Sequence, residues 1–409
     1  MKEKQGQSPS ARAFNRFIRN RSAMVGMGIT LLSVIVALLG YLITPDSTPF
    51  ANEQILPINY KSPGFEIQML KVRKNREVPE TGFFSQMLYG APNAYTLAPL
   101  NSYQIIGDTL YAETFAGDSN RSKPEKYHLV DLVFAIDETN PNIQHEGETI
   151  YYNDLAGQQQ SVLAKELTVR VEKENFATHT YYLGTDKYGR DILSQLMIGT
   201  RVSLMVGLMA MIISVLLGVV LGALAGYFGG WLDDVIMYLV NVIWAIPTIL
   251  LVFAIAIAFE DRGLWQVFFA IGVTMWVEVA RIVRGQVISM REMQFVEAAK
   301  SLGYSEGRTI FKHILPNITG PIIVQAAANF ASAILIEAGL SYLGLGAKTE
   351  VPTWGRMLSD NYGYIISGNN SFLALSPGIA IMLLVLAFNL LGNGLRDAFD
   401  VKTSLQSNR

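Results

Sequence analysis

Residues 297–317 read EAAKSLGYSEGRTIFKHILPN and occupy the one sizeable polar gap between the hydrophobic segments of the C-terminal half. The positions at the start of this stretch have helical spacing, and Gly303 then interrupts it, as a glycine just past a helix end does. Ser305 predicts the N-cap of a second short helix, which Pro316 ends before the next hydrophobic run begins. The stretch therefore predicts a projecting helix–turn–helix.

Both predicted helices are amphipathic. Apolar side chains share one side of each helix: Met293, Val296 and Ala299 on the first, and Ile310, Phe311, Ile314 and Leu315 on the second. Two small residues, Ala298 and Ala299, lie at the expected tip. Small side chains there would let the surface of a partner protein approach closely.

The same stretch resembles the EAA loop of binding-protein-dependent ABC importers. That loop has a Glu-Ala-Ala triplet, a glycine after three more residues, and a Leu-Pro pair after a spacer. The matching residues here are Glu297, Ala298, Ala299, Gly303, Leu315 and Pro316. The resemblance implies that the loop is a coupling helix that docks in a cleft of an ATPase subunit, and we include Tyr304 and Arg308 among its coupling residues. His313 stands where isoleucine is usual, which favours the peptide permeases within the family. From the residues alone, the alternative is an amphipathic loop that lies on the membrane.

The composition indicates a membrane protein. Of 409 residues, 50% are hydrophobic and 16% are charged, and the mean hydropathy is positive. The chain has no cysteine, which excludes disulfides, thiolate metal sites and a cysteine nucleophile. Its net charge of −2 gives no indication of a nucleic-acid partner.

The N-terminal region predicts a basic tail followed by a membrane helix. Residues 1–22 carry six Lys or Arg against a single acid, and residues 23–43 contain no charge. A helix of that length spans about 30 Å, enough to cross a bilayer. A cleavable signal peptide is the alternative, but the run is long for one and no Ala-x-Ala site follows it. The basic flank predicts that the tail at 1–22 is cytoplasmic and that the first transmembrane helix covers 23–44.

Residues 45–184 predict a separate domain outside the cytoplasm. They hold eighteen acids and eleven Lys or Arg but no long apolar run, and they follow a helix whose N-terminus is expected inside. Strands are predicted at residues 127–136, 149–152 and 161–171, and turns near Pro92 and at residues 117–120. The histidines of this domain are His128, His145 and His179. They lack the spacing of a metal-ligand pair, so we expect no metal site.

Residues 184–191 read GTDKYGRD, and we call them the GTD segment. Their glycines and charges predict a structured turn that leads into a short helix, with Asp191 as its N-cap. With residues 199–204, the segment resembles the GTDxxGRD…GxRxSL pattern of oligopeptide, dipeptide and nickel permeases. The matching residues of the segment are Gly184, Thr185, Asp186, Gly189, Arg190 and Asp191.

Five further apolar runs predict five more transmembrane helices. They cover residues 202–228, 235–259, 263–279, 321–345 and 373–395. Pro247 predicts a kink in the second of these runs. Gly218, Gly222 and Gly226, at four-residue spacing in the first, favour close helix packing.

The charge distribution predicts the topology of the chain. The EAA region at 281–320 holds six Lys or Arg against three acids. Six crossings that begin in the cytoplasm place this region and the tail at 399–409 in the cytoplasm, in agreement with the basic excess. Residues 185–398 would then form the permease core.

The energy for transport is expected to come from other subunits. The sequence contains no GxxxxGK[ST] for ATP, so ATP and Mg would be bound by partner ATPases and this chain would carry no cofactor. Glu337 is the main ionisable residue within the apolar runs. We expect Glu337 to make a polar contact between helices, with direct contact to substrate as the alternative.

The resemblance implies a mainly α polytopic fold of the type I ABC importer permease, with six transmembrane helices and an inserted extracytoplasmic α+β domain. It implies a transport subunit, not an enzyme, that lies in the membrane lipid of a prokaryotic cytoplasmic membrane with both termini inside. The implied partners are a homologous permease subunit, two ATPase subunits and an extracytoplasmic peptide-binding protein. Dipeptides, longer peptides and nickel chelates remain open as cargo. The alternative function is a membrane-anchored sensor whose domain at 45–184 binds an external ligand, although a sensor needs neither five further spans nor an EAA loop.

Overall fold

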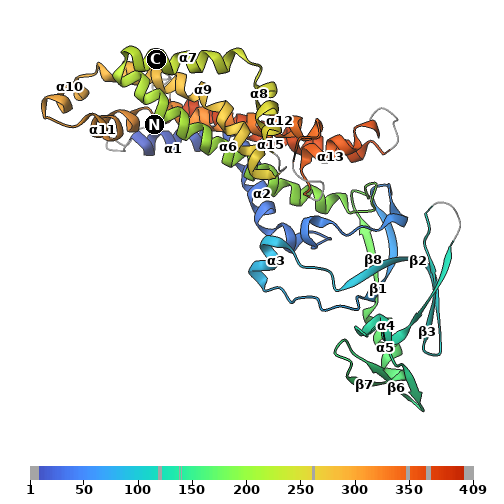
Figure 1. Ribbon diagram of the computed structural model, residues 1–409. Coiled ribbons are helices and arrows are strands. Elements are labelled where there is room, and N and C mark those ends of the chain that lie inside the picture. Colours follow the sequence, from blue (N-terminus) through green and yellow to red (C-terminus); the bar gives the residue numbers. More distant parts are fainter. Residues whose placement is uncertain are drawn as a thin grey trace. The chain divides into compact units, whose positions relative to one another are not determined.

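The computed structural model describes residues 9–117, 122–137, 139, 141–259, 263–346, 351–364 and 370–399 (Figure 1). The chain divides into two compact units. The helical unit comprises Met1–Ala37, Gly199–Gly363 and Ala374–Arg409, and the mixed unit comprises Leu38–Ile198 and Tyr364–Leu373.

Long apolar helices dominate the described chain. They are α2 Arg21–Ile43, α6 Ile192–Phe228, α9 Leu264–Arg291, α12 Thr319–Tyr342 and α15 Phe372–Phe399, with α1 Pro9–Arg19 before α2 and α13 Trp354–Asn361 after α12. Among the described residues, five helices are long and apolar enough to cross a membrane, or six if one bent pair counts as a single span. The chain is therefore mainly helical with several candidate membrane spans.

The bent pair consists of α7 Gly230–Ala245 and α8 Thr248–Ala258, whose directions differ by 95°. The break falls at Pro247, where we predicted a kink. Proline has no N–H to continue the helical hydrogen bonds, and it holds the preceding Ile246 in an extended conformation with φ −93° and ψ 129°. The pair is a broken span or a re-entrant loop.

The glycines of α6 pack against α9, as their spacing predicted. A Cβ added to Gly222 would lie 2.5 Å from the carbonyl oxygen of Ala280, and one added to Gly226 would lie 2.7 Å from that of Arg284. A Cβ added to Gly218 would lie 2.4 Å from the Cβ of Val279. Because only glycine leaves this room, the two helices approach backbone to backbone.

Two helices are longer than predicted. We expected one span to end at residue 279, but α9 continues to Arg291 because charged residues on one face do not interrupt a helical backbone. One of these, Arg284, makes two hydrogen bonds of 2.5 Å to the carboxylate of Asp233 on α7. The short helix expected after the GTD segment is likewise the first part of α6, which runs for 37 residues without a break.

The mixed unit contains two antiparallel sheets. The five-stranded sheet has the order β4-β3-β2-β1-β8, and the three-stranded sheet has the order β5-β6-β7. The strands are β1 Phe65–Arg73, β2 Tyr95–Ile106, β3 Thr109–Thr114, β4 Lys123–His128, β5 Gln144–Glu146, β6 Thr149–Asn153, β7 Gln159–Leu163 and β8 Phe176–Tyr181. The helices of this part are α3 Phe83–Tyr89, α4 Leu129–Val133 and α5 Ala164–Glu174.

Two of the three strand predictions in this unit are wrong in large part. The stretch 127–136 leaves β4 at His128 and forms α4, and the stretch 161–171 leaves β7 at Leu163 and forms α5. Leu167 and Val171, four residues apart, are fully buried in the core of the unit. This spacing is that of one face of a helix, and it predicts the structure better than the β-branched residues of the stretch do. The strand predicted at 149–152 is confirmed as β6. Residues 118–120 of one predicted turn lie outside the described residues.

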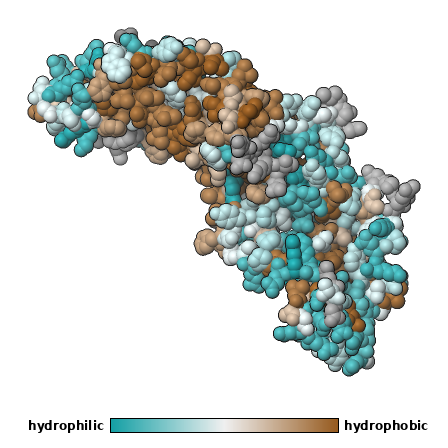
Figure 2. All heavy atoms as spheres, in the orientation of Figure 1, coloured by the Kyte–Doolittle hydropathy of each residue, from teal (hydrophilic) through white to brown (hydrophobic). Residues whose placement is uncertain are grey.

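The surface of the loop after α9 is more polar than the surface of the long helices. In Figure 2, apolar residues cover the long helices of the helical unit, whereas polar residues predominate over α10 and α11, which follow α9. The strands of the mixed unit also present a mainly polar surface.

Candidate functional site

The candidate coupling site is the loop between α9 and α12. Its first helix is α10 Gln294–Ser301, and its second begins with α11 Glu306–Thr309. A π-helical turn, Ile310–Ile314, and a 3-10 turn, Leu315–Asn317, follow, and α12 then begins at Thr319. The predicted helix–turn–helix is therefore confirmed, including its end near Pro316.

The turn between the two helices is a Schellman motif. Gly303 has a φ of +76°, and its N–H bonds the carbonyl oxygen of Lys300 at 2.9 Å. The N–H of Tyr304 bonds the carbonyl oxygen of Ala299 at 3.2 Å, which completes the motif. Ser305 then caps α11 by accepting a hydrogen bond of 3.4 Å from the N–H of Arg308. Sequence predicted both the glycine and the cap because each depends on immediate neighbours.

The loop is held on a buried apolar cluster. Val296, Ile310 and Ile314 are at most 6% exposed. They pack with residues of α6 and α9, namely Ala223, Tyr227, Val279, Val283 and Val287. The carbonyl oxygen of Tyr227 also accepts a hydrogen bond of 2.9 Å from Arg291. The loop is therefore packed on α6 and α9, two of the helices that are long and apolar enough to cross a membrane.

The residues of the Glu-Ala-Ala triplet have different surroundings. Glu297 and Ala298 are exposed, as a contact with a partner requires. Ala299 is only 3% exposed, so our expectation that both alanines meet a partner is wrong for Ala299. Its small side chain instead allows α10 to pack closely on its own protein.

Three of the polar side chains in the loop form a stack. The Arg308 guanidinium lies 4.2 Å from the centre of the Tyr304 ring, and that ring stacks on His313 with 5.5 Å between centres and 17° between planes. The stack joins the turn to the π-helical segment. Tyr304 and Arg308 therefore hold the shape of the loop, while the exposed guanidinium remains accessible.

Several large apolar side chains of the loop are exposed, and sequence reasoning missed them. Leu302 is 73% exposed, Phe311 68% and Phe295 42%. Phe311 was predicted on the buried side of its helix, but the π-helical turn places Ile310 and Ile314 inward and Phe311 outward. Exposed large apolar side chains such as these are available for contact with another protein.

The GTD segment lies in the mixed unit and is buried. Thr185, Asp186, Arg190 and Asp191 are at most 7% exposed. The Arg190 guanidinium lies 2.7 Å from the Asp186 carboxylate. Gly184 and Gly189 have φ values of +78° and +73°. A Cβ at Gly189 would lie 1.9 Å from the carbonyl oxygen of Ile55. The segment therefore holds the chain after α2 against the start of α6, and Asp191 caps α6 by accepting a 2.7 Å hydrogen bond from the N–H of Ser194.

Glu337 lies within α12 and is 1% exposed. Its carboxylate accepts a hydrogen bond of 2.7 Å from the hydroxyl of Ser341, one turn later on the same helix. The hydroxyl of Thr353, just before α13, lies 3.4 Å from that of Ser341. This arrangement favours a polar packing contact between α12 and the start of α13. Among the residues that the structure describes, no group of three or more His, Cys, Asp or Glu has the geometry of a metal site.

Two family models match this chain. Residues 218–405 match the binding-protein-dependent transport system inner membrane component, and residues 8–63 match the N-terminal transmembrane domain of oligopeptide transport permease C. The loop between α9 and α12 lies within the first match. Residues 64–217, which include most of the mixed unit, lie outside both.

Curated relatives match over just over half of the chain. The dipeptide transport system permease protein DppC of Alkalihalophilus pseudofirmus is 46% identical over 222 residues, which are 54% of this chain and 72% of the relative. The oligopeptide transport system permease protein OppC of Escherichia coli is 42% identical over 227 residues, with 54% and 72% covered. The glutathione transport system permease protein GsiD of Pectobacterium atrosepticum is 39% identical over 222 residues, with 54% and 73% covered.

Proposed function

The chain belongs to the family of binding-protein-dependent transport system inner membrane components, and from this premise we propose that it forms half of the pathway of a peptide importer. Its family is one of transport permeases and not of enzymes. In the proposed complex, this chain pairs with a homologous permease subunit. Two ATPase subunits bind on the cytoplasmic side and a peptide-binding protein docks outside.

The exposed surface of the loop between α9 and α12 carries this proposal. The loop presents Glu297, Ala298 and the apolar side chains of Leu302 and Phe311, while its inner side is buried on α6 and α9. An ATPase that binds this surface would pull on both helices when its own conformation changes. The Glu297 carboxylate offers a partner for a basic group on the ATPase.

The proposed cargo follows from what the relatives are named for. These relatives are named for the transport of dipeptides, oligopeptides and glutathione. All three cargo names denote peptides, and we propose a peptide for this chain as well. The length of that peptide would be selected mainly by the binding protein, which is another chain.

We also propose that six spans place both termini and the loop at 281–320 in the cytoplasm and the domain at 45–184 outside. The bent pair α7 and α8 would count as one span. The basic N-terminal tail and the basic excess of the loop support this orientation.

The experiment is co-purification followed by transport. This chain, carrying an affinity tag, is expressed with its neighbouring permease and ATPase genes, purified in detergent, and reconstituted into proteoliposomes with the binding protein. We expect the ATPases to remain bound and a labelled dipeptide or oligopeptide to enter only when ATP is hydrolysed. Purification of this chain without any ATPase, or with a kinase in its place, would contradict the proposal.

A further inference from the structure

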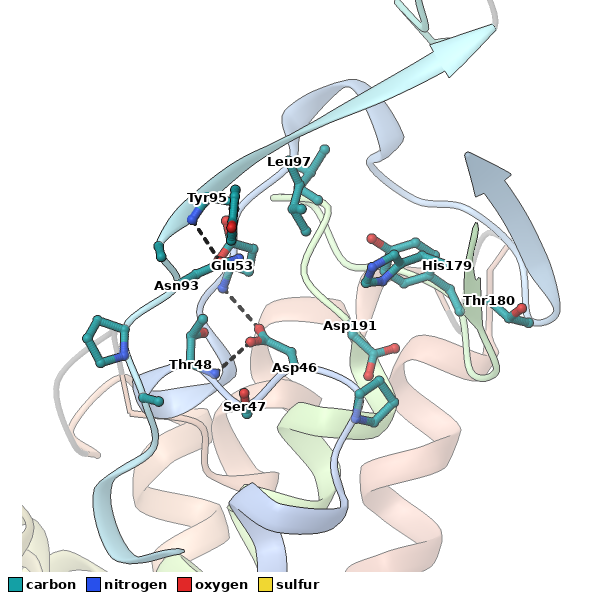
Figure 3. Close-up of a pocket in the computed structure, with 16 residues that line it drawn as sticks. Asp46, Ser47, Thr48, Glu53, Asn93, Tyr95, Leu97, His179, Thr180 and Asp191 are labelled. Carbon is teal, nitrogen blue, oxygen red and sulfur yellow. Dashed lines mark hydrogen bonds between the residues drawn. The ribbon is translucent and has the colours of Figure 1, made fainter. Parts of the chain in front are cut away.

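A pocket of about 300 Å³ lies within the mixed unit (Figure 3). Its wall comes from four separate segments: the chain after α2, the chain before and at the start of β2, the end of β8, and Asp191 just before α6. This volume is at the lower end of the range for small-molecule sites. Both family models leave most of these segments unmatched.

Three carboxylates line this pocket: Asp46, Glu53 and Asp191. Figure 3 shows Asp46 between Glu53 and Asp191. The oxygens of Asp46 accept hydrogen bonds from the N–H groups of Thr48, at 2.9 Å, and Glu53, at 3.0 Å. Burial raises the pKa of Glu53 and that of Asp191, and the charge of Asp46 raises both further. Asp46 is thus close enough to repel each of the other two carboxylates.

The Asp191 carboxylate has one unsatisfied oxygen. Its Oδ2 accepts hydrogen bonds from the N–H and the hydroxyl of Ser194. Its Oδ1 is buried and has no hydrogen-bond partner among the residues that the structure describes, although the residue is only 5% exposed. A buried carboxylate oxygen without a donor is costly, and this cost adds to the repulsion that Asp191 already has from Asp46.

Two cationic side chains near the pocket have partners within the protein. Arg190 pairs with Asp186. Lys74 donates a hydrogen bond of 3.0 Å to the carbonyl oxygen of Asn93, and its charge also lowers the pKa of Glu53. Burial, followed by the charge of Lys71, lowers the pKa of His179 on the pocket wall, which favours its neutral form. Among the described residues that line the pocket, three are acids and none is Lys or Arg. The pocket therefore has an excess of negative charge.

We propose that this pocket binds a primary ammonium group on a small organic molecule, either a free alkylamine or the amino terminus of a short peptide. An ammonium has three N–H donors for the carboxylates that line the pocket. The rings of Tyr95 and Tyr181, also on the wall, suit the adjoining carbon atoms and favour a cation. A metal ion fits less well, since the described residues hold no group with metal-ligand geometry. The inference does not depend on which cargo the permease carries.

The test is calorimetric titration of the purified full-length chain with three probes: n-butylammonium chloride, alanylalanine and N-acetyl-alanylalanine. We expect butylammonium to bind and acetylalanylalanine not to bind. Binding of alanylalanine as well would identify a peptide amino terminus as a source of the ammonium group, and binding of butylammonium alone would identify a free amine. No binding by either amine would overturn the proposal, as would equal binding of the acetylated peptide.

Two variants locate the binding in this pocket. Asp191→Asn removes the charge but keeps a good helix N-cap, and Glu53→Gln removes the second charge without touching that cap. Each is expected to weaken butylammonium binding about tenfold or more, because a hydrogen bond to a charged group is lost. Glu66→Gln, on β1 and outside the pocket wall, is the matched control and should bind as the unaltered chain does. Unchanged affinity in both pocket variants would place the binding elsewhere.

The affinity should also depend on pH in a defined direction. Because the pKa values of Glu53 and Asp191 are raised, these groups become protonated earlier than ordinary carboxyls as the pH falls. His179 also gains positive charge as the pH falls. The other charged groups that act on these side chains include Asp46, Lys71 and Lys74. Butylammonium should therefore bind more weakly at mildly acidic pH than at neutral pH, and tighter binding at acidic pH would contradict the assignment.

Discussion

Replacement of Gly303 by valine tests the turn of the proposed coupling loop without changing any packing contact. Gly303 has a φ of +76°, and an added Cβ would have no atom within 4 Å. The cost of the substitution is therefore entirely one of backbone conformation. A left-handed residue with a Cβ costs about 1–2 kcal/mol, and a strained β-branched residue up to about 3 kcal/mol. At about 2 kcal/mol, the population of the native turn falls roughly 30-fold relative to its alternatives.

This loss should disturb the loop and leave the membrane helices in place. The hydrogen bonds at risk are those from Gly303 to Lys300 and from Tyr304 to Ala299, which close α10. We expect the variant to insert and to keep its partner permease, but to lose ATPase on purification or to hydrolyse ATP without import. Both quantities can be measured on the reconstituted complex, as ATPase retained per permease and as peptide imported per ATP.

Gly307→Val is the matched control. Gly307 lies in α11 of the same loop, and an added Cβ there also meets nothing within 4 Å, but its φ is not in the left-handed region. Valine is at least as good as glycine in a helix, so this variant should be close to neutral. If Gly303→Val imports at the normal rate with ATPase firmly bound, the turn is not part of the coupling contact and our reasoning about the loop fails.

Three further predictions follow from the same structure. Glu297→Lys reverses an exposed charge without changing a buried residue. ATPase retention should therefore fall while the thermal stability of the isolated chain stays the same. A loss of thermal stability would instead assign Glu297 a structural role. Asp186→Asn leaves Arg190 buried without its ion-pair partner and should destabilise the mixed unit by about 3–5 kcal/mol. The measurement is the rate of proteolysis of that unit, which should rise. An unchanged rate would refute the structural role of the pair. A reporter fused after Asp154 should be extracytoplasmic and one fused after Gly307 cytoplasmic, and the opposite result would reverse the proposed topology.

The parts of the fold that depend on adjacent residues could be predicted from the sequence. Gly303 must be left-handed because the helix ends beside it, and Ser305 and Asp191 can cap because the helix begins next to them. Pro247 breaks its helix for the same local reason. Element lengths were harder to predict, since a charge on one face ends an apolar run but not a helix, as α9 shows beyond residue 279.

The parts that depend on distant residues could not be predicted. The stretch that holds Leu167 and Val171 has β-branched residues typical of a strand, but the core of the mixed unit buries it as a helix. The pocket brings Asp46 and Glu53, from the chain after α2, together with Asp191, which lies far along the sequence, so no sequence pattern joins the three. The burial of the GTD segment is also a tertiary property, since Gly189 is required by its contact with Ile55 far away in the sequence.

The structure divides the residues of the coupling loop into two roles that the sequence pattern alone does not separate. Ala299 and Gly303 act within the protein, because one is buried and the other forms the turn. Glu297 and Ala298 are exposed, but together they offer little apolar area, and burial of apolar area supplies most of the free energy of protein association. Leu302 and Phe311 supply that area. We infer that Glu297 and Ala298 position the ATPase and that the exposed apolar side chains of Leu302 and Phe311 supply most of the binding energy.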